Sequence, residues 1–238
     1  MPEWWTYTLS DIQSFSLHSY YRLFELYNRA IWPAQVVALA LGLGMGSGLH
    51  LPHRGSGLHL PHRGSGLHIQ RGRLIAGILA GCWLWIAVAF HATRYKTLTW
   101  TAVYFAWAFG LEAALLLWTG VVRGRLTFER RPAGLAIFLF ALVVPPLLGP
   151  LFGRSWSQVE VFGVAPDPTA IGTLGLILVA TGRVRWELMA LPLLWCAISG
   201  ATLLSMRAPD AWIPLAAAMI VLLLATGKTL SGRRKESR

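Results

Sequence analysis

Charged side chains are scarce in this sequence. Only 13% of the 238 residues are Asp, Glu, Lys or Arg, while 55% are hydrophobic. Soluble domains carry about 25% charged residues, and so few polar side chains could not cover this much apolar sequence in water. A bilayer span needs about 20 mostly apolar residues, and the apolar runs suffice for six or seven spans. The composition therefore predicts an all-α, polytopic transmembrane helical bundle.

Cysteines and catalytic motifs are scarce too. Cys82 and Cys196 both lie inside apolar runs, so no disulfide framework is expected. The sequence contains no Ser/His/Asp arrangement, HExxH motif or P-loop pattern. The first 30 residues also lack the basic start and apolar core of a cleavable signal. We therefore expect a protein that is not an enzyme and needs no cofactor.

The net charge of +11 is spread between the apolar runs and the C-terminus instead of forming one stripe. This distribution argues against nucleic acid as a partner. It favours the lipid bilayer and its anionic lipid headgroups. With seven spans, most of the 21 Lys and Arg residues fall on the side of the C-terminus. The positive-inside rule then places the N-terminus outside and the C-terminus in the cytoplasm.

The pattern of apolar residues divides the chain into three parts. Residues 1–30 contain an amphipathic helical pattern with Ser16 as its predicted N-cap, and we expect this segment either in the membrane interface or packed on neighbouring loops. Residues 31–227 form the predicted transmembrane bundle, and residues 228–238 form a basic cytoplasmic tail. The predicted spans are 31–50, 73–92, 99–121, 133–152, 168–182, 186–206 and 211–227.

An internal repeat interrupts the end of the first span. Residues 46–54 and 55–63 share the sequence GSGLHLPHR, and residues 64–68 begin a third copy. Imidazole clusters bind zinc, nickel or copper, so a metal site is one interpretation. Identical repetition is typical of a tandem duplication, however, and no nearby Cys or carboxylate completes a tetrahedral site. We favour an inserted His-rich loop over residues 46–68. The histidines of the alternative metal site are His50, His53, His59, His62 and His68.

Two features inside the predicted membrane region carry the functional hypotheses. Glu112 is an acidic residue near the middle of the third span, where a charged side chain costs about 3 kcal/mol on insertion. We expect its carboxyl either on an ion or substrate path, or as a neutral group hydrogen-bonded to Ser199, Thr202 or a backbone carbonyl. Pro145 and Pro146 remove two helix hydrogen bonds from the fourth span and predict a kink or a break. Broken helices line substrate sites in transporters, and simple packing kinks have the same sequence pattern.

Other patterns concern packing and the outer surface. Gly77 and Gly81 form a GxxxG motif in the second span, which predicts a close helix contact there. Cys82 and Cys196 share the predicted depth of Glu112, which would suit a soft metal ion, although cysteine is also a common filler of apolar cores.

The outer segment 153–167 carries three charged residues that could pair with each other or gate an entrance. These residues are Arg154, Glu160 and Asp167. Asp167 and Pro168 are also predicted as the N-cap and the first residue of the fifth span, which is the shortest.

Several stretches together resemble a known family. They are YYRLFELYNRAIWPAQ (20–35), FGVAPDPTAIGTLGL (162–176), LPLLWCAISGATL (191–203) and PDAW (209–212). They resemble an uncharacterised family of bacterial polytopic membrane proteins that is known only as a domain of unknown function. The resemblance implies a bacterial inner-membrane location and carries no activity or site residues.

These observations predict an integral membrane protein that acts as a small-solute or ion transporter or as a permease component. Glu112, Pro145 and Pro146 would then lie on the path. The alternative is a non-catalytic membrane scaffold or subunit that binds a partner protein. Assembly as a homo-oligomer or with a membrane partner is open under both hypotheses.

Overall fold

A computed structural model describes residues 15–50, 64–129 and 131–236. Apart from one antiparallel bridge between Phe128 and Ala180, the regular structure of these residues is helical. Two of the short elements, η2 and η4, are π-helical continuations of α-helices, and η3 and η5 are 3-10 turns. The elements are α2 (Leu17–Ala30), α3 (Ala34–His50), α4 (Gly64–Trp85), η2 (Ile86–Ala92), η3 (Tyr95–Thr97), α5 (Ala102–Leu116), η4 (Leu117–Val122), α6 (Pro132–Leu151), η5 (Trp156–Gln158), α7 (Pro166–Val179), α8 (Trp186–Ser205) and α9 (Trp212–Glu236).

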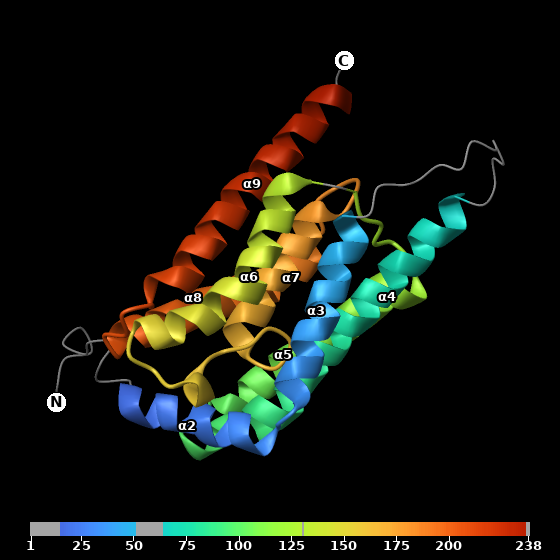
Figure 1. Ribbon diagram of the computed structural model, residues 1–238. Coiled ribbons are helices and arrows are strands. Elements are labelled where there is room, and N and C mark those ends of the chain that lie inside the picture. The colour runs from blue at the N-terminus through green and yellow to red at the C-terminus, as the bar shows by residue number, and fades with distance from the viewer. Residues whose placement is uncertain (1–14, 51–63, 130, 237–238) are drawn as a thin grey trace.

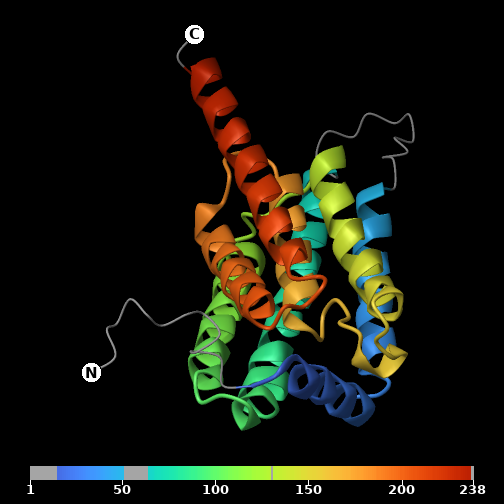
Figure 2. The same ribbon diagram turned by 90° about the vertical axis from the view of Figure 1, so that its left-hand side faces the viewer.

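The long helices form a bundle, and α2 lies across one end of it (Figure 1). The axes of α2 and α3 differ by 87°. The start of α6 and the end of α9 lie at the opposite end of the bundle from α2, and α9 extends beyond its neighbours (Figures 1 and 2). We call the end that holds α2 the α2 end, and the other the α9 end.

Helix α7 is the centre of the bundle. All of its residues, from Pro166 to Val179, are buried, and α4, α6, α8 and α9 pack around it. A helix that is apolar on every side is stable only when other elements cover it completely. Gly134 and Gly175 allow α6 and α7 to touch backbone to backbone, because a Cβ on Gly175 would lie 2.7 Å from the amide nitrogen of Phe138.

The outer faces of the bundle expose large apolar side chains. Trp107 on α5 is 76% exposed and Leu223 on α9 is 65% exposed. Among the described residues, five helical segments are long and apolar enough to cross a membrane, counting α4 with η2 and η3 and α5 with η4. The count is six if the bent pair of α2 and α3 forms one span. An apolar outer surface over long apolar helices is what a lipid environment requires.

The helices overlap the predicted ranges, but α4 begins at Gly64, inside the predicted loop 46–68, and α9 continues to Glu236, through most of the predicted tail. The count of seven spans is not confirmed. The predicted fifth span is α7, which has 14 residues and is too short to cross a bilayer as a straight helix. The first predicted span is α3, which meets the length requirement only together with α2. Helix α2 itself begins where predicted, and the side chain of Ser16 caps it by accepting a hydrogen bond from the amide of Ser19 at 3.2 Å.

One of two local predictions differs from the structure. The N-cap of α7 is Ala165 and its first residue is Pro166, so the prediction of Asp167 as N-cap was wrong. Pro166 already supplies the fixed φ that suits a first helical residue, which leaves the Asp167 carboxyl free to contact α8. Helix α6 continues from Pro132 to Leu151 through Pro145 and Pro146, so of the predicted kink or break it has the kink, which is visible as a bend in Figure 1.

Candidate functional site

Four charged side chains are buried together at the α2 end of α7. Arg154 and Glu160 come from the loop after α6, Asp167 from the first turn of α7, and Asp210 from the loop between α8 and α9. None of them is more than 9% exposed. They line one cavity of about 30 Å³, to which Pro145 also contributes. A cavity of this size can hold a water molecule or a small ion. We call these four residues the acidic cluster.

The acidic cluster holds more negative than positive groups. The guanidinium of Arg154 donates a hydrogen bond to Asp210 Oδ2 and lies 4.9 Å from the centre of the Tyr21 ring. Burial raises the pKa of Glu160 well above its usual range, and the nearby Asp167 raises it further. Three carboxyl groups share one guanidinium here, and unpaired buried charges are very unfavourable. The cluster is therefore expected to retain a proton at neutral pH.

Asp167 connects the cluster to α8. Its Oδ1 accepts a hydrogen bond from Trp195 Nε1 at 2.7 Å, and its Oδ2 accepts one from Ser199 Oγ at 2.6 Å. The Asp167 carboxyl accepts both hydrogen bonds, which stabilises its charged form. The helix dipole at the N-terminal end of α7 favours the negative charge as well. The sequence predicts Ser199 as one of the alternative partners of Glu112. In the structure Ser199 donates its hydrogen bond to Asp167 instead, because α7 packs directly against α8.

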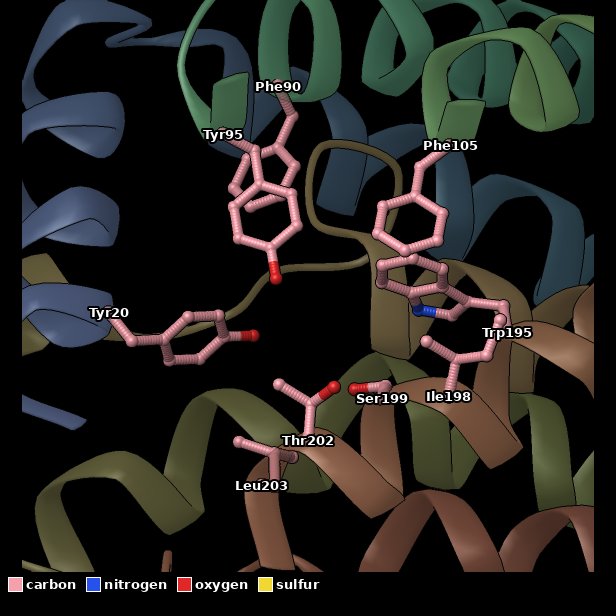
Figure 3. A pocket seen from close by; sticks show the side chains of 9 residues that line it. All are labelled: Tyr20, Phe90, Tyr95, Phe105, Trp195, Ile198, Ser199, Thr202 and Leu203. Atoms are coloured by element: carbon pink, nitrogen blue, oxygen red, sulfur yellow. The ribbon is translucent and has the colours of Figure 1, made fainter. Parts of the chain in front are cut away.

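A second, smaller cavity adjoins the acidic cluster. Its volume is about 10 Å³, which is room for about one water molecule. Figure 3 shows the hydroxyl groups of Tyr20, Tyr95, Ser199 and Thr202 directed toward this space, with the indole of Trp195 beside them. Ser199 belongs to both sites, since it lines this cavity and donates to Asp167. The two cavities thus form adjacent spaces that polar side chains line.

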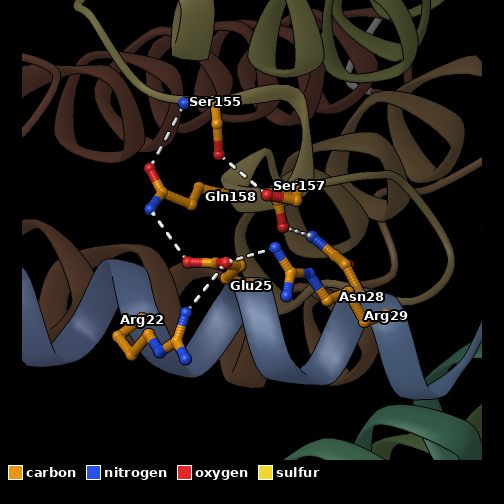
Figure 4. Close-up of polar contacts among 7 residues, drawn as sticks. All are labelled: Arg22, Glu25, Asn28, Arg29, Ser155, Ser157 and Gln158. Carbon is orange, nitrogen blue, oxygen red and sulfur yellow. Dashed lines mark hydrogen bonds and ion pairs between the residues drawn. The ribbon is translucent and has the colours of Figure 1, made fainter.

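Helix α2 and the loop around η5 cover the α2 end of the site. Glu25 accepts from Arg22 at 2.8 Å, from Arg29 at 2.7 Å and from the Gln158 side chain at 3.4 Å. Asn28 Nδ2 donates to the carbonyl oxygen of Ser157 at 2.9 Å (Figure 4). The amphipathic character of α2 explains this arrangement: its apolar face packs on the bundle while its polar face holds the loop. Tyr20, on the same helix, donates from its hydroxyl to Glu160 at 3.5 Å.

The buried acid of α5 lies apart from the cluster. Glu112 is fully buried, and neither of its carboxyl oxygens has a hydrogen-bond partner among the described residues. The expected neutral carboxyl bonded to Ser199 or Thr202 is therefore not observed. Pro145 lines the acidic cavity, whereas Pro146, its neighbour in α6, does not. That these three residues lie on a path stays a prediction.

His91, in η2, is buried without a hydrogen-bond partner among the described residues. Its ring packs against Phe109 at 4.5 Å and Trp195 at 5.0 Å between ring centres. π-Helical segments such as η2 are frequent at functional sites. Cys82 and Cys196 are both free and buried.

The structure does not test the predicted histidine metal site. His53, His59 and His62 lie outside the described residues, and the side chains of His50 and His68 are not described either. Within the described part of the chain, no three His, Cys, Asp or Glu side chains are close enough to hold a metal ion together. The acidic cluster is therefore not arranged as a metal cage.

Comparison with known proteins places the chain in one family. The family model DUF6064, described as a family of unknown function, matches residues 17–236. The chain belongs to this family. The matched region of DUF6064 includes the whole acidic cluster, Glu112 and His91. No curated protein and no solved structure matches the chain.

Sequence reasoning found only part of this site. It singled out Arg154, Glu160 and Asp167 as residues that could pair or gate an entrance, and all three are in the cluster. It missed Asp210 and the hydrogen bond from Trp195. A usable signal existed, because Asp210 is in the loop that follows the sixth predicted span and hence belongs to the same end of the bundle as residues 153–167.

Proposed function

We propose that this chain is a proton-coupled transporter of a small solute or ion, or a permease component with that role, in the bacterial inner membrane. The observation that carries the proposal is the acidic cluster, in which three buried carboxyl groups share one guanidinium. Such a cluster needs a bound proton or cation to balance its charge. Ionisable groups buried within a membrane bundle commonly mark ion and proton pathways. The protein would act without catalysis and without a cofactor.

The inward path would run from the cluster toward Glu112. Asp167 holds the indole of Trp195, and Trp195 packs at 5.0 Å on Phe109, which lies one turn before Glu112 on α5. Aromatic rings fill this region, so passage would require Trp195 or Phe109 to move. The water-sized cavity bounded by Ser199 lies on the cluster side of this aromatic barrier.

The proposed orientation puts the α2 end outside the cell and the α9 end in the cytoplasm. Most basic residues between the helices then face the cytoplasm. The 87° bend between α2 and α3 supports a position of α2 along the outer interface. In this orientation the acidic cluster faces the outside, where it would receive protons from the medium.

Proton flux into vesicles tests the proposal. The protein is reconstituted into liposomes that contain a pH-sensitive dye, an inside-negative potential is imposed, and pools of small solutes and ions are added outside. We expect solute-dependent acidification with the wild-type protein. Asp167→Asn and Glu112→Gln should reduce it to the level of empty liposomes, because the first removes a carboxyl of the acidic cluster and the second removes the buried acid on the proposed path.

The matched control is Glu187→Gln, which removes an acid whose side chain is 50% exposed at the start of α8. This variant should retain the wild-type flux. Wild-type flux in Asp167→Asn, or a wild-type protein indistinguishable from empty liposomes in every pool, would refute the proposal.

A partner-binding subunit is the second candidate, and one surface favours it. A groove of about 470 Å³ at the bend between α2 and α3 is lined by Trp32 and Trp156, which are 69% and 66% exposed. A photo-crosslinker at Trp32 should then form one protein adduct in cells that is absent when it replaces Trp107, on the outer face of α5. Adducts with lipid alone at both positions would exclude this candidate.

A further inference from the structure

A basic cavity lies at the α9 end of the bundle, opposite the acidic cluster. Its volume is about 530 Å³, within the range of roughly 300–1,000 Å³ that is usual for small-ligand sites. Two cations, one aromatic ring and one hydroxyl line it, and none of the described residues that line it is acidic. The lining residues are Gly182, Arg183, Val184, Trp186, Lys228, Thr229 and Gly232.

The position of this cavity matches the headgroup level of a membrane. It lies between the first residue of α8 and the last part of the apolar segment of α9, where two candidate spans end. Trp186 is the kind of amphipathic residue that is enriched at this level. Leu223 and Leu230 on α9 are 65% and 60% exposed, so apolar surface for acyl chains lies on the helix that also forms the cavity.

We propose that this cavity binds the phosphate headgroup of an anionic phospholipid. Basic pockets between transmembrane helices on the cytoplasmic side suit such headgroups. Arg183 would contribute a planar guanidinium, which recognises phosphate oxygens in pairs, and Thr229 a hydroxyl donor. The adjacent apolar helix surface favours a lipid over a soluble phosphate, since a soluble ligand would not use it.

Lys228 connects the cavity to the central helix. Its Nζ donates to the carbonyl oxygen of Ala180 at 2.6 Å and to that of Leu178 at 3.4 Å. A cation at this position complements the partial negative charge at the C-terminal end of α7. An ammonium group has three N–H donors, so one more is available to a phosphate oxygen. A bound headgroup would therefore share Lys228 with α7, whose other end holds Asp167.

Lipid retention measured by native mass spectrometry tests this site. The wild-type protein in phosphatidylcholine micelles is titrated with phosphatidylglycerol, and Arg183→Gln and Lys228→Gln are compared with it. We expect the affinity for phosphatidylglycerol to fall about fivefold for each cation removed. Arg123→Gln is the matched control, since Arg123 is an exposed cation at the same end that lies outside the cavity and over the Trp118 ring, and it should bind like the wild type.

Two results would overturn the proposal. The first is wild-type retention of phosphatidylglycerol by Arg183→Gln, a variant that leaves the Lys228 contacts with α7 intact and so serves even if Lys228→Gln does not fold. The second is displacement of the lipid by excess glycerol phosphate, which would assign the cavity to a soluble phosphate.

Discussion

At the scale of single residues, Arg154 supplies the positive charge that stabilises the acidic cluster. It is 8% exposed, it pairs with Asp210, and it lies among three carboxyl groups. Removing one partner of a buried ion pair leaves the other charge without compensation, which costs far more than an exposed pair contributes. The cluster therefore depends on this guanidinium and on bound protons together.

We predict that Arg154→Gln lowers the free energy of unfolding by about 3–5 kcal/mol at alkaline pH and by less at acidic pH. The raised pKa of Glu160 means that the folded protein binds a proton more tightly than the unfolded chain. Stability should then fall as pH rises from the ordinary Glu pKa, about 4.3, through the raised folded value. The free energy of unfolding of Arg154→Gln should fall more steeply with pH than that of the wild type.

Thermal unfolding in detergent at a series of pH values measures this effect. Arg185→Gln is the control, because Arg185 forms a 3.7 Å pair with Glu187, whose side chain is half exposed, and such pairs contribute little. An Arg154→Gln variant with the stability of the control at alkaline pH would contradict the prediction.

At the scale of elements, the close contact of α6 and α7 holds the site in place. A Cβ on Gly175 would lie 2.8 Å from the carbonyl oxygen of Gly134 and 2.7 Å from the amide nitrogen of Phe138. Backbone atoms cannot move aside as a flexible side chain can. Helix α7 carries Asp167, and α6 carries Pro145, so their separation sets the width of the acidic cavity.

We therefore predict that Gly175→Ala forces α6 and α7 apart and lowers the stability by about 1–3 kcal/mol or more. Gly81→Ala is the matched control, since a Cβ on Gly81 would meet nothing within 4 Å. Unfolding temperatures of the two variants in the same detergent give the comparison. Equal temperatures would show that the helices are not in backbone contact.

The sequence predicted the position of the helices better than their contacts. Long apolar runs are a property of each segment alone, so the ranges of α6 and α8 could be predicted to within one residue. The GxxxG motif at Gly77 and Gly81 predicted a close contact, yet a Cβ added to Gly77 would meet only Val121 Cγ2, at 3.7 Å. The close approach of α4 to η4 is one residue earlier, between Ala76 and Gly120. Which helices face each other depends on the packing of the whole bundle, which the sequence of one segment does not determine. For this reason the contact between Asp167 and Ser199 was not predicted.

At the scale of the whole molecule, two polar sites lie at opposite ends of a bundle whose core is mostly apolar. The acidic cluster lies at the α2 end of α7 and the basic cavity at its other end. Large apolar residues cover the outer faces of the helices between them. This distribution suits a bundle that crosses a bilayer, with α2 and the end of α9 at opposite surfaces.

Cysteine accessibility tests the orientation. In a background with Cys82→Ala and Cys196→Ala, Thr97→Cys probes the exposed loop at the α2 end and Ser231→Cys the exposed end of α9. We predict that a membrane-impermeant maleimide labels intact cells at position 97, and at position 231 only after permeabilisation. The reverse pattern would contradict the orientation given by the positive-inside rule.

The central claim is that the acidic cluster holds a proton, and infrared difference spectroscopy of the reconstituted protein tests it most directly. The carbonyl stretch of a protonated carboxyl group is followed during a pH titration. We predict a protonated carboxyl that persists well above the usual range of Glu, because burial raises the pKa of Glu160, and we predict its loss in Glu160→Gln. If this signal is the same in Glu160→Gln as in the wild type, or if every carboxyl ionises in the usual range, the cluster does not store a proton.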